Sequence, residues 1–144
     1  ATPNPNAVAA QNLVRLAVLS GDDKWRVQAD TLLDGILAMA GRNLFGHVAL
    51  LNALDLRLRG AEIVATGPDA ERFAQTALKL PFTDRIVLRA IAAADLPATH
   101  PAQEKLKATT ASAAFVCVGE TCSLPVTAPE QIAEAVATMR QSAR

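Results

Sequence analysis

Two cysteines near the end of this 144-residue chain are the residues with the most distinctive chemistry. Cys117 lies in an apolar stretch, residues 113–118, and Cys122 follows after a turn at Gly119, with four residues between the two cysteines. Free cysteine behaves as a small hydrophobic residue, and disulfides are rare in cytosolic proteins, so the residues favour two partly buried free thiols. A disulfide across the turn is the first alternative, because the spacing permits the Cα–Cα distance that a disulfide requires but does not impose it.

Metal binding and catalytic redox chemistry are further alternatives for this cysteine pair. A structural zinc site needs four ligands, and His47 and His100 do not have ligand spacing to the cysteines. The motif is not C-x-x-C, and no lysine, arginine or histidine adjoins either thiol to lower its pKa. Cys117 and Cys122 therefore stay as redox candidates, and we expect neither a metal nor a cofactor.

The other polar residues with possible chemistry have simpler structural explanations. Asn4 and Asn6 could hydrogen-bond a sugar-like ligand from the start of a helix, but capping of that helix is the simpler explanation for one of them. Gly67-Pro68-Asp69 could bind phosphate between a strand and a helix, but it lacks the glycines and the lysine of known phosphate loops. A lone histidine such as His47 or His100 is more often structural than catalytic. We predict no catalytic residue.

Composition and charge exclude several classes of partner. Fourteen basic residues balance fourteen acidic ones, and aromatic residues make up 3% of the chain, which does not suit nucleic-acid binding. No apolar run reaches the roughly 18–20 residues that span a membrane. The chain begins without Met and without the pattern of a signal peptide, so we expect a fragment or processed chain in the cytoplasm.

Hydrophobic periodicity predicts a helical front half. Three helices are expected, at about 7–19, 24–40 and 45–59. The first and third are apolar nearly all round and should be buried, whereas the second has one polar side. Together they form the predicted helical segment, residues 1–60.

After Gly60 the pattern changes to strands that alternate with helices. Apolar runs predict strands near 61–66, 84–89 and 113–118, and a C-terminal helix near 128–142 for which Thr127 and Glu130 have capping-box spacing. Alternating strands and helices predict right-handed crossovers and a parallel sheet. We therefore predict an α/β chain, in which a small three-stranded parallel sheet with flanking helices occupies residues 61–144.

The cysteine stretch also resembles a family signature. The pattern Phe115-Val116-Cys117-x4-Cys122-x2-Pro125-Val126-Thr127-x-Pro129-Glu130 is similar to the C-terminal signature of a thioredoxin-domain family that includes the spermatogenesis-associated thioredoxin-like proteins. The start of the chain, residues 3–9, resembles the Pro-Ser-Gly-Asn helix start of that family, and residues 62–64 and 85–88 resemble its final α/β segment. The resemblance covers essentially the whole chain but only the last part of the family protein.

This resemblance implies a fold context and three alternative functions. In the family, a thioredoxin-like domain precedes an (α/α) toroid similar to six-hairpin glycosidases and sugar epimerases, so the three helices would be the end of that toroid. The first implied function is a non-catalytic C-terminal domain with a structural or interaction role. The second is part of a carbohydrate-active enzyme with Asn6 as the ligand-binding candidate, because Asn4-Pro5 replaces the family's Ser-Gly. The third is a thiol redox element at Cys117 and Cys122.

A toroid divided in this way leaves apolar helix faces without their neighbours. Besides the remainder of the parent chain, we therefore expect a second copy as partner, in a homodimer that buries the helix faces around Leu13 and Leu51, with or without exchanged helices. Light scattering at high micromolar concentration should give the mass of a dimer. A clean monomer would contradict this prediction.

Overall fold

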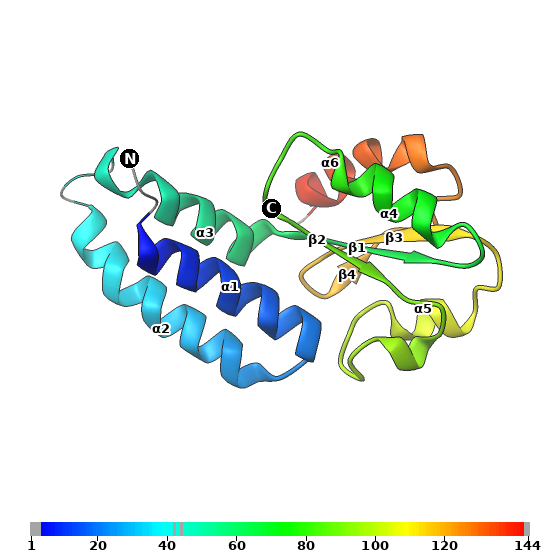
Figure 1. Ribbon diagram of the computed structural model, residues 1–144, viewed down its shortest axis with the longest axis horizontal. Helices are drawn as coiled ribbons and strands as arrows, with labels where there is room; N and C mark the ends of the chain where they lie inside the picture. The colour runs from blue at the N-terminus through cyan, green and yellow to red at the C-terminus, as the bar shows by residue number, and fades with distance from the viewer. Residues whose placement is uncertain (1–3, 42, 44, 143–144) are drawn as a thin grey trace. The chain divides into compact units, whose positions relative to one another are not determined.

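The structure, a computed structural model, describes residues 4–41, 43 and 45–142 (Figure 1). The chain divides into two compact units, Ala1–Leu58 and Arg59–Arg144. Helical elements are α1 (Pro5–Ser20), α2 (Asp23–Ala40), η1 (Phe45–His47), α3 (Val48–Arg59), α4 (Ala70–Leu78), η2 (Ala93–Asp95), α5 (Gln103–Lys107), η3 (Pro129–Gln131) and α6 (Ile132–Ser142). The strands are β1 (Ala61–Thr66), β2 (Arg85–Arg89), β3 (Ala113–Val118) and β4 (Thr121–Cys122).

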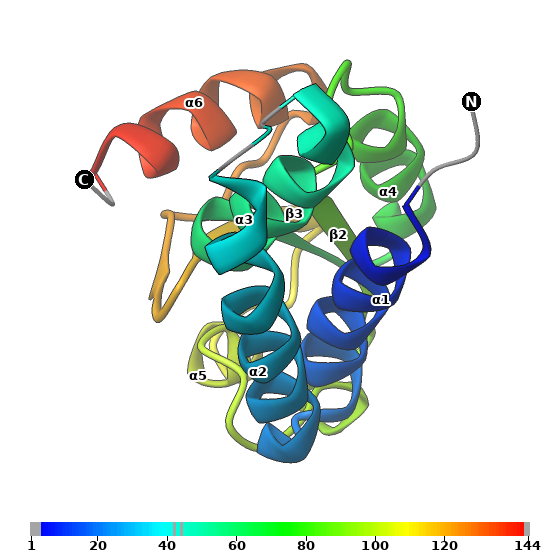
Figure 2. The same ribbon diagram turned by 90° about the vertical axis from the view of Figure 1, so that its left-hand side faces the viewer.

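The first unit begins with a helical hairpin. Asn4 caps α1, because its Oδ1 accepts a hydrogen bond of 3.0 Å from the backbone N–H of Asn6. Gly21 ends α1 in the left-handed region, at φ 66°. The short connection that follows makes α1 and α2 side-by-side neighbours (Figure 2).

Small and apolar side chains from three helices form the core of this unit. The buried members are Ala7 and Ala10 of α1, Leu33 and Ala40 of α2, and Leu50 and Ala53 of α3. At the unit's surface, the Arg57 guanidinium donates to both carboxylate oxygens of Asp30, at 2.6 and 2.8 Å. These hydrogen bonds lower the pKa of Asp30 and join α2 to α3.

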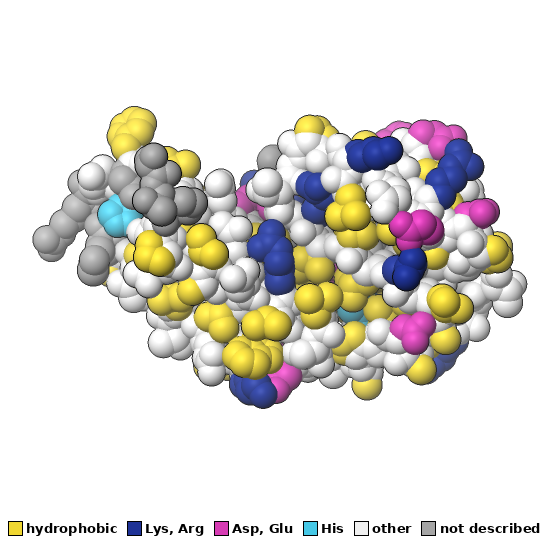
Figure 3. All heavy atoms as spheres, in the orientation of Figure 1, with side chains coloured by type: hydrophobic (Ala, Val, Ile, Leu, Met, Phe, Trp, Pro, Cys, Tyr) yellow, Lys and Arg dark blue, Asp and Glu magenta, His cyan; other side chains and the backbone are white. Residues whose placement is uncertain are grey.

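The expectation that the first and third helices are buried nearly all round is wrong. Several of their large apolar side chains are exposed, namely Val8, Leu16 and Leu19 on α1 and Val48, Leu51 and Leu58 on α3. Hydrophobic side chains accordingly reach the surface over the helical unit (Figure 3). None of the helices among the described residues is both long and apolar enough to span a membrane.

The second unit contains a four-stranded mixed sheet with the strand order β2-β1-β3-β4. The predicted α/β class is confirmed, and β1 and β2 are parallel as expected. The predicted three-stranded parallel sheet is wrong, because β3 runs antiparallel to β1 and a short fourth strand pairs with β3.

The two connections explain the difference in strand direction. The nine-residue helix α4 carries the chain back along the sheet between β1 and β2, as a parallel crossover requires. Between β2 and β3 the longest helix is α5, with five residues, which is about 8 Å long. This segment contains no helix of strand length that runs back along the sheet, and β3 starts at the end of the sheet where β2 stops, so β3 is antiparallel to β1.

Helices cover one face of this sheet and the segment between β2 and β3 covers the other. α4 and α6 lie on the first face (Figure 1), where side chains such as Ile63, Phe73, Val116 and Ile132 form the core. All six residues of β3 are buried, because this strand has a neighbour on each side and cover on each face. The closing helix is not capped by Thr127 as predicted: it is entered through η3, whose N-cap is Ala128, without a side-chain cap.

Gly67 follows β1 at a position that requires glycine for two reasons. Its φ of +83° lies in the left-handed region, and a Cβ there would lie 2.6 Å from the Cα of Ser112 and 2.8 Å from the carbonyl oxygen of Ala111. Gly119 also has a positive φ, +59°, but a Cβ there would meet nothing within 4 Å. A side chain at Gly119 would therefore cause backbone strain alone, whereas one at Gly67 would cause both strain and steric overlap.

We expect Gly67→Ala to lower the free energy of unfolding by roughly 3 kcal/mol or more, because it combines strain with a backbone clash. The matched control, Gly119→Ala, should cost about 1 kcal/mol, since only strain applies. Urea unfolding followed by far-ultraviolet circular dichroism measures both. Equal losses for the two variants would contradict the close approach of the Gly67 turn to Ser112.

Candidate functional site

Cys117 and Cys122 form a disulfide between neighbouring strands. The two residues are direct partners in the register of β3 and β4, their Cα atoms are 3.9 Å apart and their sulfur atoms are 2.01 Å apart. The sequence preference for free thiols is therefore wrong, and the first alternative, a disulfide across the turn, is what the structure contains.

A two-residue turn produces this register. Gly119 and Glu120 connect Val118 to Thr121, which are paired, and the next pair outward is Cys117 with Cys122. Gly119 has a positive φ at the first turn position, as a type II′ hairpin turn requires. A longer turn would place the same two cysteines out of register, which is why their spacing alone did not decide between a disulfide and free thiols.

The chain continues along β3 after the disulfide. The backbone N–H of Ser123 donates to the carbonyl oxygen of Val116 at 2.8 Å, and the N–H of Val116 donates to Ser123 Oγ at 3.1 Å. Further on, Ala114 and Val126 exchange two backbone hydrogen bonds of 2.9 and 2.8 Å. The disulfide thus lies at the hairpin end of an edge segment that is hydrogen-bonded to β3 at Ser123 and again at Val126.

A carboxylate and an imidazole lie in the same row of the sheet as the disulfide. Glu62 of β1 is the direct partner of Cys117 in the antiparallel register, and opposed residues of such a pair share one face with Cβ atoms about 5 Å apart. His100 Nε2 lies 3.2 Å from Glu62 Oε2, and the side chains are only 3% and 17% exposed. The two groups are close, but their alignment is not that of a hydrogen bond.

The tautomer of His100 follows from its second nitrogen. The backbone N–H of Ala102 donates to His100 Nδ1 at 3.1 Å, so Nδ1 carries a lone pair and the ring proton is on Nε2. The Nε2–H group therefore faces the Glu62 carboxylate. His100, for which the sequence favoured a structural role, is a buried residue that contacts Glu62 of β1.

Lys105 supplies a positive charge beside Cys122. Its ammonium group donates to the carbonyl oxygens of Cys122 and Ser123 at 3.1 and 2.8 Å. Sequence reasoning missed this cation because it searched only the residues adjoining the thiols, whereas Lys105 reaches Cys122 from α5 across 17 positions of sequence.

Side-chain hydrogen bonds fix the loop that carries His100. Asp95 Oδ2 accepts the backbone N–H groups of Ile91 and Ala92, and these bonds lower the pKa of Asp95. Gln103 Nε2 donates to the carbonyl oxygens of Ala93, Leu96 and Pro97. The positions of His100 and Lys105 therefore depend on a loop held by side-chain hydrogen bonds rather than on a long helix.

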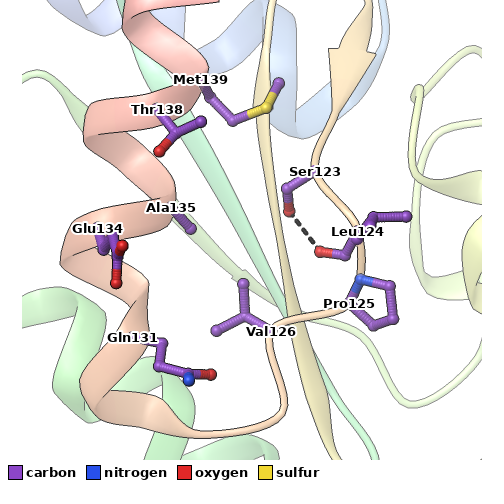
Figure 4. A pocket seen from close by; sticks show the side chains of 9 residues that line it. All are labelled: Ser123, Leu124, Pro125, Val126, Gln131, Glu134, Ala135, Thr138 and Met139. Carbon is purple, nitrogen blue, oxygen red and sulfur yellow. Dashed lines mark hydrogen bonds between the residues drawn. The ribbon is translucent and has the colours of Figure 1, made fainter.

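A separate groove lies between the segment after β4 and α6 (Figure 4). Its volume is about 390 Å³, and its lining consists of Ser123, Leu124, Pro125, Val126, Gln131, Glu134, Ala135, Thr138 and Met139. The side chains of Val126, Ala135 and Met139 give it an apolar lining, with Gln131 at the end of η3 and Glu134 on α6 (Figure 4). It is a shallow apolar groove without a group that would do chemistry.

The remaining predicted residues do not form a site. Asn6 is exposed in the first turn of α1, whose cap is Asn4, and His47 Nδ1 contacts the carbonyl oxygen of Asn43 at 2.8 Å. Within residues 4–41, 43 and 45–142, no three histidine, cysteine or acidic side chains are grouped to hold a metal ion. Comparison of the chain with models of protein families, with curated proteins and with solved structures finds no match.

We expect reduction of the disulfide to lower the free energy of unfolding by about 2 kcal/mol, the loop-closure contribution of a short loop. Urea unfolding with and without a thiol reductant measures the difference. The double variant Cys117→Ala, Cys122→Ala is the control and should unfold at the same urea concentration in both conditions. If the wild-type chain is equally insensitive to the reductant, the disulfide does not stabilise the hairpin.

Proposed function

We propose that this chain is a non-catalytic C-terminal module of a larger thioredoxin-like, toroid-containing protein, with a structural or interaction role. One observation carries the proposal: the residues of the family-like signature, from Phe115 to Glu130, build part of the central strand β3, the hairpin to the edge segment and the entry to the last helix. A signature whose residues stabilise the fold is what we expect of a domain with a structural or interaction role.

Each part of the signature has an architectural use. Phe115 and Val116 are buried in β3, Cys117 and Cys122 close the hairpin, and Val126 forms an isolated bridge with Ala114. Pro129 is buried at the first position of η3, directly before α6. The signature therefore attaches the edge segment to the central strand and directs the chain into its last helix.

The helical unit supports an interaction role. The exposed apolar side chains of α1 and α3 are the kind of surface that a partner covers. We propose the remainder of the parent chain or a second copy of this chain as that partner. The homodimer remains a prediction for light scattering to test.

If the signature is architectural, Val126→Ala should lower the free energy of unfolding by about 2 kcal/mol, since Val126 is 8% exposed and loses buried methyl groups. Leu124→Ala is the matched control, because Leu124 lies in the same segment at a position that the signature leaves unspecified, and it is 82% exposed. Its effect should stay within about 0.5 kcal/mol. Urea unfolding measures both variants, and a Val126→Ala loss no larger than that of Leu124→Ala would contradict an architectural role.

A second candidate function, a thiol redox element, is favoured by the asymmetry of the disulfide. Cys117 is completely buried, whereas Cys122 is partly exposed and has the Lys105 ammonium on its own carbonyl. Exchange needs one sulfur that an external group can reach, and a nearby cation favours its thiolate. This candidate requires the pair to open and close without unfolding of the chain. The carbohydrate-active alternative, with Asn6, stays a prediction that no contact among the described residues supports.

A further inference from the structure

Glu62, whose side chain is 17% exposed, and the buried His100 form a polar pair on the covered face of the sheet. A carboxylate and an imidazole on the covered face of a small sheet are costly where apolar side chains would pack, and their neighbours Val64 and Phe115 are buried hydrophobic residues. The register places the carboxylate directly opposite Cys117, which is 0% exposed.

We propose that Glu62 is the base that takes the proton from Cys117 when the cysteine pair closes, with His100 as the residue that positions its carboxylate. This inference rests on the second candidate function, the thiol redox element. Lys105 has the complementary role at the other sulfur, because its charge favours the thiolate of Cys122.

The reaction that this arrangement suits uses a disulfide as oxidant. The thiolate of Cys122, the accessible sulfur, attacks one sulfur of the oxidant, so a mixed disulfide forms and one thiolate leaves. Cys117 then gives its proton to the Glu62 carboxylate and attacks Cys122 Sγ, and the second thiolate leaves as the Cys117–Cys122 bond forms. Two electrons pass from the cysteines to the oxidant, and Glu62 releases its proton to water.

The burial of Cys117 is the reason that it needs a base. A thiol in apolar surroundings is harder to ionise than one in water, and only the thiolate attacks a disulfide. Glu62 stands opposite Cys117 on the same face of the sheet, and in the proposed step its carboxylate accepts the proton without water having to enter the core. The Nε2–H of His100, 3.2 Å from Glu62 Oε2, keeps the carboxylate in the row of the disulfide.

The other charged groups near Glu62 and the disulfide are bonded to other partners or are exposed on the hairpin turn. On α5, Glu104 and Lys107 form an exposed ion pair with each other, and Lys105 is bonded to the carbonyls of Cys122 and Ser123. Asp95 is bonded to the backbone of its own loop. Glu120 is exposed on the hairpin turn, so it offers a matched control for a Glu→Gln change at Glu62.

The test follows the closing of the pair in the full chain. The reduced protein is mixed with glutathione disulfide, samples are quenched with acid, and mass spectrometry separates reduced chain, mixed disulfide and closed disulfide between pH 4 and 9. Wild type, Glu62→Gln and Glu120→Gln are compared, and circular dichroism verifies that each is folded. We expect Glu62→Gln to accumulate the mixed disulfide on Cys122 and to resolve it roughly 100-fold more slowly, whereas Glu120→Gln resolves it like the wild type.

Each other outcome contradicts either the role of Glu62 as the base or the redox function itself. If Glu62→Gln resolves the mixed disulfide at the wild-type rate or faster, with the same pH profile, Glu62 is not the base although the pair is still redox-active. If the folded wild-type chain forms no disulfide with glutathione disulfide, the redox function fails, and this inference fails with it. Should Glu62→Gln not fold, the wild-type profile decides: a resolution rate that does not fall at acid pH contradicts a carboxylate base.

Discussion

The antiparallel pairing of β1 with β3 is the constraint on which the second unit depends. It joins the strand that leaves the helical region to the strand that carries the cysteine stretch, and it places Glu62 opposite Cys117. Because β3 is central and buried along its whole length, every later element of the unit is built on it. The edge segment pairs with the side of β3 that β1 does not use. α6 packs on the face of the sheet where Val116 and Ile132 belong to the core.

One geometry serves both proposed functions of the hairpin. The disulfide and the backbone hydrogen bonds of Ser123 and Val126 hold the edge segment on β3, which is the architectural role. The same pairing leaves one sulfur buried beside a carboxylate and the other partly exposed beside a lysine, which is what exchange chemistry would use. Both roles use the same arrangement of atoms. They differ in whether the Cys117–Cys122 disulfide can be reduced and re-formed while the chain stays folded.

Apolar runs and periodicity were sufficient to locate most elements but not to orient them. The strand at 61–66 and the strand at 113–118 have the predicted bounds, because a continuous apolar run identifies a buried strand in either direction. The direction of β3 depends on how far the segment before it travels, and β4, with two residues, is too short to have a pattern. The cysteines were recognised from the sequence as the residues with distinctive chemistry. Glu62 lies opposite Cys117 because of the strand register, and His100 and Lys105 are positioned by the hydrogen-bonded loop between β2 and β3. Neither the register nor this loop can be read from the residues next to the cysteines.

Cross-strand contacts between β1 and β3, measured by nuclear Overhauser effects between backbone protons of the oxidised chain, are the most direct test of this arrangement. We expect the antiparallel series Glu62 with Cys117, Val64 with Phe115, and Thr66 with Ala113. This result would place the carboxylate, the buried sulfur and the hairpin in one row. Contacts in the parallel sense, with Glu62 near Ala113 and Thr66 near Cys117, would contradict the sheet and remove the basis of both functional proposals.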